Sequence, residues 1–267
     1  DCIGPMARTV KDIAKILTVI AGEDPNDDLT GNVKKDDYLK EIKNSDRDFL
    51  DDFTIGLPVE IFGKVPELEE PIHQTLKKLE GKGVELKEVG IDHYKYTLPT
   101  WIAIATTEFG AYFRSKTNNY WLLNLQNIHL NQKLHDINRS KINDVNKNIK
   151  ERLIYSEHLN SNYDDQYYSL ASKARHALTN DVDNIFEEVD IMASLTIPML
   201  PPKWDDRLDE DWESITNTCI FNITGHPALT VPCGEVEGLP VGIQLIGSKY
   251  DEKTILKVGS IIEKMLK

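Results

Sequence analysis

Cys233 is a side chain whose type and position could support nucleophilic chemistry. It lies in a Val-Pro-Cys-Gly stretch at the expected end of a strand, where a reactive cysteine could sit. A thiolate forms near neutral pH only when a histidine, another base or a helix N-terminus lowers the pKa of the thiol. The sequence reveals no such neighbour, and buried cysteines that only pack are common. We therefore interpret Cys233 as a packing residue.

Motifs for metals, nucleotides and serine hydrolysis are missing from the chain. It contains no His-Glu-x-x-His motif and no paired Cys-x-x-Cys, and His129 with His135 has no convincing third ligand among the 7 histidines. We expect no metal site. Neither of the glycine-rich phosphate-binding motifs, Gly-x-Gly-x-x-Gly and Gly-x-x-x-x-Gly-Lys-Ser/Thr, occurs in the sequence. No Gly-x-Ser-x-Gly turn is present either. We therefore expect no cofactor.

The bulk composition excludes several classes of partner. The 267 residues carry a formal net charge of −13, which argues against direct binding to nucleic acid and against a basic membrane-surface helix. No apolar run reaches the roughly 18–20 residues that span a bilayer. The 3 cysteines (Cys2, Cys219 and Cys233) are an odd number and widely spaced, so we expect no disulfide framework and a cytoplasmic protein.

Strands and helices are expected to alternate along the chain. A strand at 53–58, an amphipathic helix at 66–82 and an alternating strand at 84–89 predict a crossover unit with parallel strands. The pattern predicts further helices at 9–21, 99–113, 164–186, 212–221 and 251–266, and further strands at 191–195, 228–232 and 241–246. The helix at 99–113 is mostly apolar, so we expect it to be buried on several sides. Such alternation predicts an α/β fold.

Long stretches of this chain resemble amidase-signature enzymes. Residues 4–12 read Gly-Pro-Met-Ala-Arg-Thr-Val-Lys-Asp, similar to the segment that follows the signature region of that family, and residues 21–27 continue it. Residues 190–198 resemble the family's strand leading to a Thr-x-Pro loop. Residues 221–234 look like its late motif, and residues 238–247 follow at the expected distance. The matches are in the right order and span nearly the whole chain.

The resemblance implies a fold and a domain organisation. The expected fold is a mixed β-sheet covered by helices on both faces. We expect residues 1–267 to be the C-terminal part of a single amidase-signature domain, with residues 114–165 a loosely matching helical surface region. The first residue is Asp1 and not an initiator Met, and the family's catalytic segment precedes the match to residues 4–12. We therefore expect the N-terminal catalytic part to be missing from this chain.

The resemblance also implies a reaction on linear amides. Family members cleave or transfer from carboxamides with a Ser nucleophile, a bridging Ser in a cis peptide and a Lys base. The Gly/Ser-rich signature and the upstream Lys lie before the segment matched by residues 4–12, so no residue here is assigned to catalysis. The parent protein is thus expected to be an amidase, and this chain alone is expected to be inactive.

Four residues are candidates for shaping the substrate pocket. Trp101, Ile197 and Phe221 are aromatic or apolar, and each could instead be an ordinary core residue. Arg175 resembles an arginine that binds the glutamine carboxylate in the A subunit of tRNA-dependent amidotransferases, a task suited to a guanidinium. A surface arginine on a long helix is the alternative interpretation.

Three classes of parent protein remain open. We favour a stand-alone amidase acting on small or aryl-alkyl amides. The alternative is the glutamine-hydrolysing A subunit of an amidotransferase, but Ile215 stands where that subunit usually carries an Asp, residues 109–114 depart from its pattern, and residues 225–228 look more like general amidases. A non-catalytic truncated module is the third.

Expected partners are a small amide substrate and the missing N-terminal half, and the resemblance also admits a homodimer. A sheet split between two halves should leave an unpaired edge and an exposed apolar face.

Overall fold

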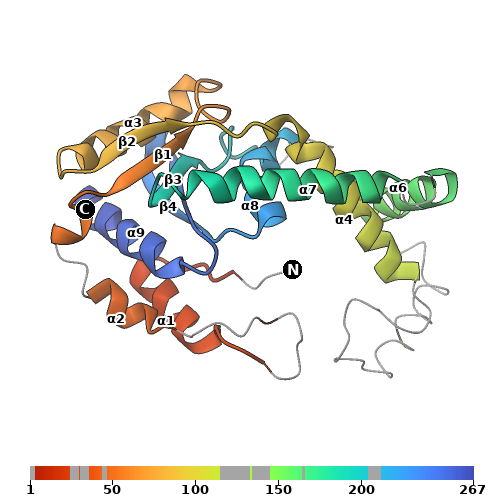
Figure 1. The fold of residues 1–267 in the computed structure, drawn as a ribbon, viewed down its shortest axis with the longest axis horizontal. Helices are drawn as coiled ribbons and strands as arrows, with labels where there is room; N and C mark the ends of the chain where they lie inside the picture. Colours follow the sequence, from red (N-terminus) through yellow and green to blue (C-terminus); the bar gives the residue numbers. More distant parts are fainter. Residues whose placement is uncertain are drawn as a thin grey trace. The chain divides into compact units, whose positions relative to one another are not determined.

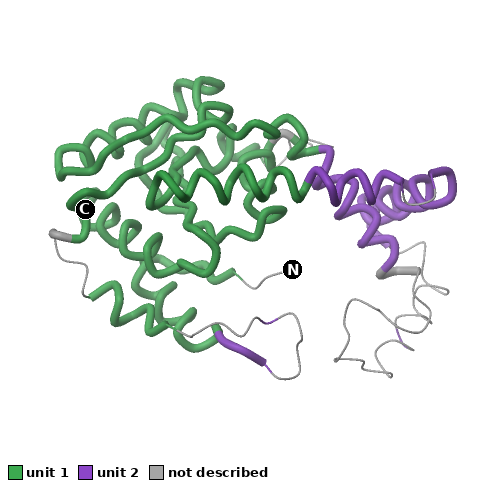
Figure 2. Tube along the Cα trace, viewed as in Figure 1, with its two compact units in different colours: residues 1–21, 35–98, 175–267 green, residues 22–34, 99–174 purple. Residues whose placement is uncertain are grey.

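The structure is a computed structural model that forms two compact units. It describes residues 4–24, 30, 36–43, 47–114, 133, 145–163, 166–203 and 212–267. Residues 1–21, 35–98 and 175–267 make up unit 1, and residues 22–34 and 99–174 make up unit 2 (Figure 2). The sheet lies in unit 1, so this unit carries most of the fold that the sequence predicts.

The sheet of unit 1 has five strands in the order β2-β1-β3-β5-β4. The strands are β1 (Thr54–Pro58), β2 (Glu85–Val89), β3 (Ile191–Leu195), β4 (Ala228–Val236) and β5 (Leu239–Gly247). β1 runs parallel to β2 and β3, whereas β5 runs antiparallel to β3 and β4. The mixed sheet expected from the sequence is confirmed.

The crossover unit forms as the sequence predicts, with helix α3 (Pro66–Glu80) between the parallel strands β1 and β2 (Figure 1). A buried carboxylate fixes the start of α3: Glu69 accepts hydrogen bonds from the backbone N–H groups of Gly63, Lys64 and Val65 at 2.9, 3.1 and 3.1 Å. These donors precede the helix and would otherwise be unsatisfied, so the buried charge is compensated.

Helices cover both faces of the sheet and make two cores. On one face, α1 (Val10–Ile20), α2 (Tyr38–Lys43), α3 and α9 (Glu252–Leu266) pack against side chains such as Ile191, Ala193 and Leu195. On the other, the end of α7 (Gln166–Ile185) and α8 (Thr216–Thr224) pack against Met192 and Ile246 (Figure 1). All five residues of β3 are buried, as expected of a strand enclosed on both sides.

Unit 2 consists of helices in the residues described. They are α4 (Thr97–Arg114, from residue 99), α6 (Lys147–Tyr163) and the first part of α7. The hydroxyl of Tyr168 on α7 donates to the carboxylate of Glu108 on α4 at 2.9 Å. α6 exposes most of its side chains, including Ile154 and Tyr155, as expected of a surface helix. Residues 115–132 and 134–144, where a further surface helix was expected, lie outside the described residues.

The prediction that the helix at 99–113 is buried on several sides is wrong. Thr100 and Thr106 are buried, but Trp101, Ile102 and Ile104 are only half-buried. The physical reason is that, in the described residues, the unit holds helices without a sheet to pack on. Within the described residues, no helix is both long and apolar enough to cross a membrane.

Candidate functional site

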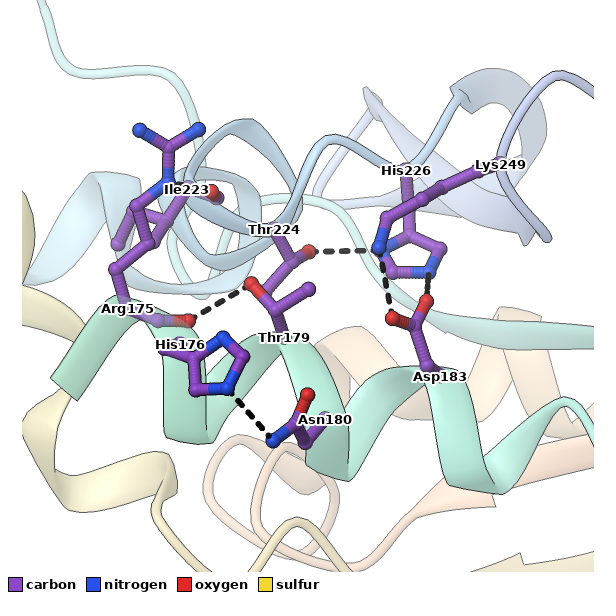
Figure 3. Close-up of polar contacts among 9 residues, drawn as sticks. All are labelled: Arg175, His176, Thr179, Asn180, Asp183, Ile223, Thr224, His226 and Lys249. Atoms are coloured by element: carbon purple, nitrogen blue, oxygen red, sulfur yellow. Dashed lines mark hydrogen bonds and ion pairs between the residues drawn. The ribbon is translucent and has the colours of Figure 1, made fainter. Parts of the chain in front are cut away.

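Arg175 is fixed by the end of a neighbouring helix. It lies on α7, and its Nε donates a hydrogen bond of 2.8 Å to the backbone carbonyl of Ile223 on α8. Ile223 is in the last turn of α8, where carbonyls have no partner within the helix. The arginine therefore satisfies an otherwise open acceptor. Its two terminal amino groups point away from α7 in Figure 3 and could grip an anion as a pair.

A polar chain centred on His226 joins the same two helices at a second point: it includes Asp183 of α7, Thr224 of α8, His226 just after α8 and Lys249 after β5. Nδ1 of His226 is 2.8 Å from the hydroxyl oxygen of Thr224, and Nε2 is 3.1 Å from a carboxylate oxygen of Asp183 (Figure 3). Lys249 Nζ contacts the other carboxylate oxygen of Asp183 at 2.7 Å. Because a carboxylate only accepts, Nε2 carries the proton and Nδ1 accepts from the Thr224 hydroxyl.

The imidazole of His226 is neutral at ordinary pH. Its side chain is 0% exposed, and Phe186 stacks on it with ring centroids 5.2 Å apart. Burial lowers the pKa of His226 to about 4, although the nearby Asp183 carboxylate works in the opposite direction. The order hydroxyl, imidazole, carboxylate also occurs in nucleophilic triads. Here Thr224 is only 3% exposed, so the hydroxyl is enclosed and a structural task fits it better than attack on a substrate.

A second polar network lies in the core at the end of β3. Asn217 Nδ2 donates to the carbonyl of Leu195 at 3.0 Å, and Asn217 Oδ1 accepts from the Tyr94 hydroxyl at 3.3 Å. Gln244 Nε2 donates both to the Ser194 hydroxyl and to the carbonyl of Asn217, each at 3.0 Å. These bonds tie α8, β5 and the 3₁₀ turn Tyr94–Tyr96 to the point where β3 leads into its loop.

The candidate pocket residues from the sequence have different environments. Arg175 is exposed apart from its bond to α8, and Ile197, in the loop after β3, is 47% exposed. Phe221 is 1% exposed and packs in the core on the α7 and α8 face of the sheet. Trp101 belongs to unit 2 and is half-buried on α4. The structure thus brings Arg175 and the helix of Phe221 together within unit 1.

The two described cysteines are poor nucleophiles in this fold. Burial raises the pKa of Cys233 to about 11 and that of Cys219 to about 12. The thiol of Cys233 donates to the carbonyl of Val241 at 3.4 Å. This agrees with the interpretation of Cys233 as a packing residue. His129 and His135, considered as metal ligands, lie outside the described residues.

Comparison with known proteins identifies the family. A family model described as Amidase matches residues 1–256. The chain belongs to the Amidase family. Among curated relatives, this amidase chain is 32% identical over 281 residues to the A subunit of glutamyl-tRNA(Gln) amidotransferase of Chloroflexus aggregans, covering 99% of this chain and 54% of that protein. The corresponding protein of Caldanaerobacter subterraneus is 31% identical, with 100% and 55% covered. The amidase chain spans about half the length of the curated relatives it matches.

Solved structures support the same assignment. The amidase chain superposes on the crystal structure of the A subunit of glutamyl-tRNA(Gln) amidotransferase from Thermotoga maritima with a TM-score of 0.74 and 26% identity, covering 98% of this chain and 52% of that one. A bacterial aryl acylamidase of the amidase signature family gives a TM-score of 0.75 at 18% identity, covering 98% and 52%. That second likeness shows the fold alone. The expected amidase-signature fold is thereby confirmed.

Sequence reasoning did not find the polar chain centred on His226. Thr224 and His226 stand out in the sequence only as part of a family motif, although a hydroxyl two residues before a histidine at a helix end is a local signal. Asp183 gave no signal, because it lies 43 residues from His226 and reaches it only through the packing of α7. Asn217 and Gln244 were missed for the same reason.

Proposed function

We propose that the whole protein hydrolyses a carboxamide to a carboxylate and ammonia, and that this chain shapes part of its substrate pocket. The match to the Amidase family over residues 1–256 supports this proposal. The serines and the lysine of the resembled mechanism would come from outside this chain. A serine oxygen attacks the amide carbon while the lysine takes its proton. As the C–N bond breaks, the lysine-held proton passes to the leaving nitrogen, which departs as ammonia; water then attacks the acyl-enzyme, and the carboxylate and the free serine are released.

The observation that carries the substrate proposal is the fixed orientation of Arg175. Its Nε is engaged by the Ile223 carbonyl, which leaves a pair of amino groups on one edge of the guanidinium. A carboxylate binds such an edge with two parallel hydrogen bonds. We infer that the amide substrate carries a carboxylate. This specific feature also favours the second candidate, a glutamine-hydrolysing A subunit, because glutamine is such an amide.

Ile215 separates the two candidates. It is half-buried in the 3₁₀ turn Trp212–Ile215, at the position where the A subunit usually holds the aspartate that grips the amino group of glutamine. An aliphatic side chain cannot compensate an ammonium charge. The stand-alone amidase is therefore expected to prefer an acid amide without an amino group, whereas an amidotransferase subunit would prefer glutamine.

Ammonia release by the full-length protein tests both the carboxylate-binding role of Arg175 and the choice between the two candidate functions. The substrates are glutamine, glutaramate (the same molecule without the amino group) and the neutral propionamide. We expect glutaramate to be cleaved with the lowest KM. Arg175→Gln should raise the KM for glutaramate about tenfold or more, because a charge-assisted pair is lost, and should leave propionamide unchanged. Equal losses on glutaramate and propionamide would reject the carboxylate role of Arg175, and ammonia release from none of the three would reject the amidase proposal.

We further propose that the rest of the amidase polypeptide covers two surfaces of this chain. Among the described strands, β4 pairs with β5 alone, and its alternate side chains Thr230 and Pro232 are exposed. Met6 and Ile20, at either end of the α1 segment, are 96% and 50% exposed. An open strand edge and exposed apolar side chains favour association. The occupant we infer is the missing half, because the chain spans only 54% of a relative such as the Chloroflexus aggregans protein.

Co-expression of the two halves tests this partner. The chain alone is expected to aggregate and to release no ammonia, and the two halves together are expected to form a 1:1 complex that does. Ile20→Lys should weaken the complex, whereas Lys11→Gln, on the same helix and also exposed, is the matched control. A monodisperse, cooperatively unfolding monomer of this chain alone would contradict the proposal.

A further inference from the structure

The end of α8 is held against α7 at two points. The first is the bond from Arg175 to the Ile223 carbonyl, and the second is the chain Asp183–His226–Thr224. Arg175 and Asp183 are eight residues apart on α7, or about 12 Å along a helix with a rise of 1.5 Å per residue. Two separated contacts fix both the distance and the angle of the end of α8, which one contact alone would not.

The backbone at the end of α8 explains why the Ile223 carbonyl is available. Gly225 has φ +79°, in the left-handed region, and turns the chain sharply after the helix. The N–H groups of Gly225 and His226 both donate to the carbonyl of Phe221, at 2.9 and 3.1 Å. The Ile223 carbonyl accepts its hydrogen bond from Arg175 Nε instead, and the same turn places the His226 ring beside the Thr224 hydroxyl (Figure 3).

We propose that His226 is a positioning residue, which joins α7 to the end of α8 so that the Ile223 carbonyl holds Arg175 in the orientation that receives the substrate carboxylate. This inference rests on the function proposed for Arg175. The ring is enclosed and contacts no solvent, so it acts through Thr224, Asp183 and the backbone and not on the substrate. Loss of the His226 contacts would let the end of α8 shift and would free the guanidinium to rotate.

Two variants of the full-length enzyme interrupt the hydrogen bonds between Asp183, His226 and Thr224 at different contacts. Thr224→Val removes the hydroxyl that donates to Nδ1 with little change in shape, and His226→Leu removes both ring contacts. His226→Gln is the conservative variant, since its amide can still donate to Asp183. Lys249→Gln is the matched control, because it removes the ion pair on Asp183 and leaves the histidine contacts in place.

Steady-state kinetics should separate positioning from a general structural effect. We expect His226→Leu and Thr224→Val to raise the KM for glutaramate roughly tenfold, comparable with loss of one charge-assisted hydrogen bond, and to leave kcat and the cleavage of propionamide unchanged. His226→Gln should recover part of the loss, and Lys249→Gln should behave as the native enzyme. The proposal would be overturned if these two variants changed the kinetics of glutaramate and propionamide equally, or if neither variant changed the KM for glutaramate.

A readout independent of activity follows the Arg175 Nε–H proton. In the native protein this proton donates to a backbone carbonyl, so its NMR signal should exchange slowly with water; Arg175→Lys assigns the signal by removing it. Exchange should quicken in His226→Leu and Thr224→Val and stay slow in Lys249→Gln. Unchanged exchange in both variants would refute the positioning role even if Arg175 binds the carboxylate. Faster exchange with no effect of Arg175→Gln on glutaramate would uphold the positioning role and refute the carboxylate role instead.

Discussion

Replacing Asn217 by leucine should be among the most destabilising conservative changes in unit 1. The substitution keeps a side chain of similar size but strands two buried groups: the Leu195 carbonyl, now bonded at 3.0 Å, and the Tyr94 hydroxyl, now bonded at 3.3 Å. A buried polar group left without a partner costs about 1–3 kcal/mol. The longer bond to Tyr94 is the weaker of the two, so we expect Asn217→Leu to lower the free energy of unfolding by about 2–4 kcal/mol in total.

Urea unfolding followed by circular dichroism measures this effect. Tyr94→Phe provides the partner variant, because it removes the hydroxyl that Asn217→Leu would strand; alone it should cost only about 1 kcal/mol. The double variant should therefore be less destabilised than the sum of the single variants, by roughly 1 kcal/mol. A loss below about 0.5 kcal/mol in Asn217→Leu, within the range of ordinary surface changes, would refute the reasoning. Strict additivity would show that the bond between Tyr94 and Asn217 contributes nothing.

Three further outcomes follow from single side chains. Gly234→Ala would place a Cβ 2.7 Å from the Cβ of Pro71, so thermal unfolding should show that the free energy of unfolding falls by about 1–3 kcal/mol. Gly4→Ala is the control, because its Cβ would have nothing within 4 Å and the free energy of unfolding should not change. Burial depresses the folded pKa of His226 from 6.5 to about 4, although the Asp183 carboxylate acts in the opposite direction; Lys249 adds to the lowering. The unfolded chain therefore takes up the extra proton at a higher pH than the folded protein, so stability should decrease as the pH is lowered from 6.5 to about 4, by at most about 3.4 kcal/mol. His226→Gln should flatten that part of the pH profile of the unfolding free energy. Cys233, whose pKa is raised to about 11, should react with a disulfide reagent at pH 8 only after urea is added; prompt reaction of the native protein would contradict its burial.

Local patterns predicted the crossover unit because each of its elements is specified by its own residues. The helical spacing of Ile72, Leu76 and Leu79 agrees with the burial of those side chains. The strand expected at 84–89 also forms, but its burial does not alternate, because Val84 and Val89 are buried in the cores on opposite faces of the sheet. The helix ends at Glu80 with Gly81 as its C-cap, two residues before the predicted end at 82, and Gly83 with φ +100° turns the chain into β2. Local preference and tertiary packing point to the same structure here, so the sequence was sufficient.

The hairpin of β4 and β5 is longer than its sequence predicted. The strands were expected at 228–232 and 241–246, but they extend over Ala228–Val236 and Leu239–Gly247. Pro232 and Gly234 resemble a strand end when taken as a local signal. In the structure they mark an irregularity in the register, on a strand with β5 as its partner in the described sheet. A proline and a bulge are tolerated at a sheet edge, and edge position is a tertiary property that periodicity does not encode.

Arg175 was found from the sequence because it lies in a family-like stretch, but its geometry depends on α8. The carbonyl that orients it belongs to Ile223, 48 residues further on, and is a backbone atom that any residue would supply. What must be specified is the turn that points this carbonyl at α7, and that turn depends on Gly225, Thr224 and His226. The motif residues around 225 thus matter for an arginine far away in sequence. A substitution at Gly225 should therefore disturb the Arg175 contact through the backbone, whereas one at Ile223 should act mainly through the packing of its buried side chain.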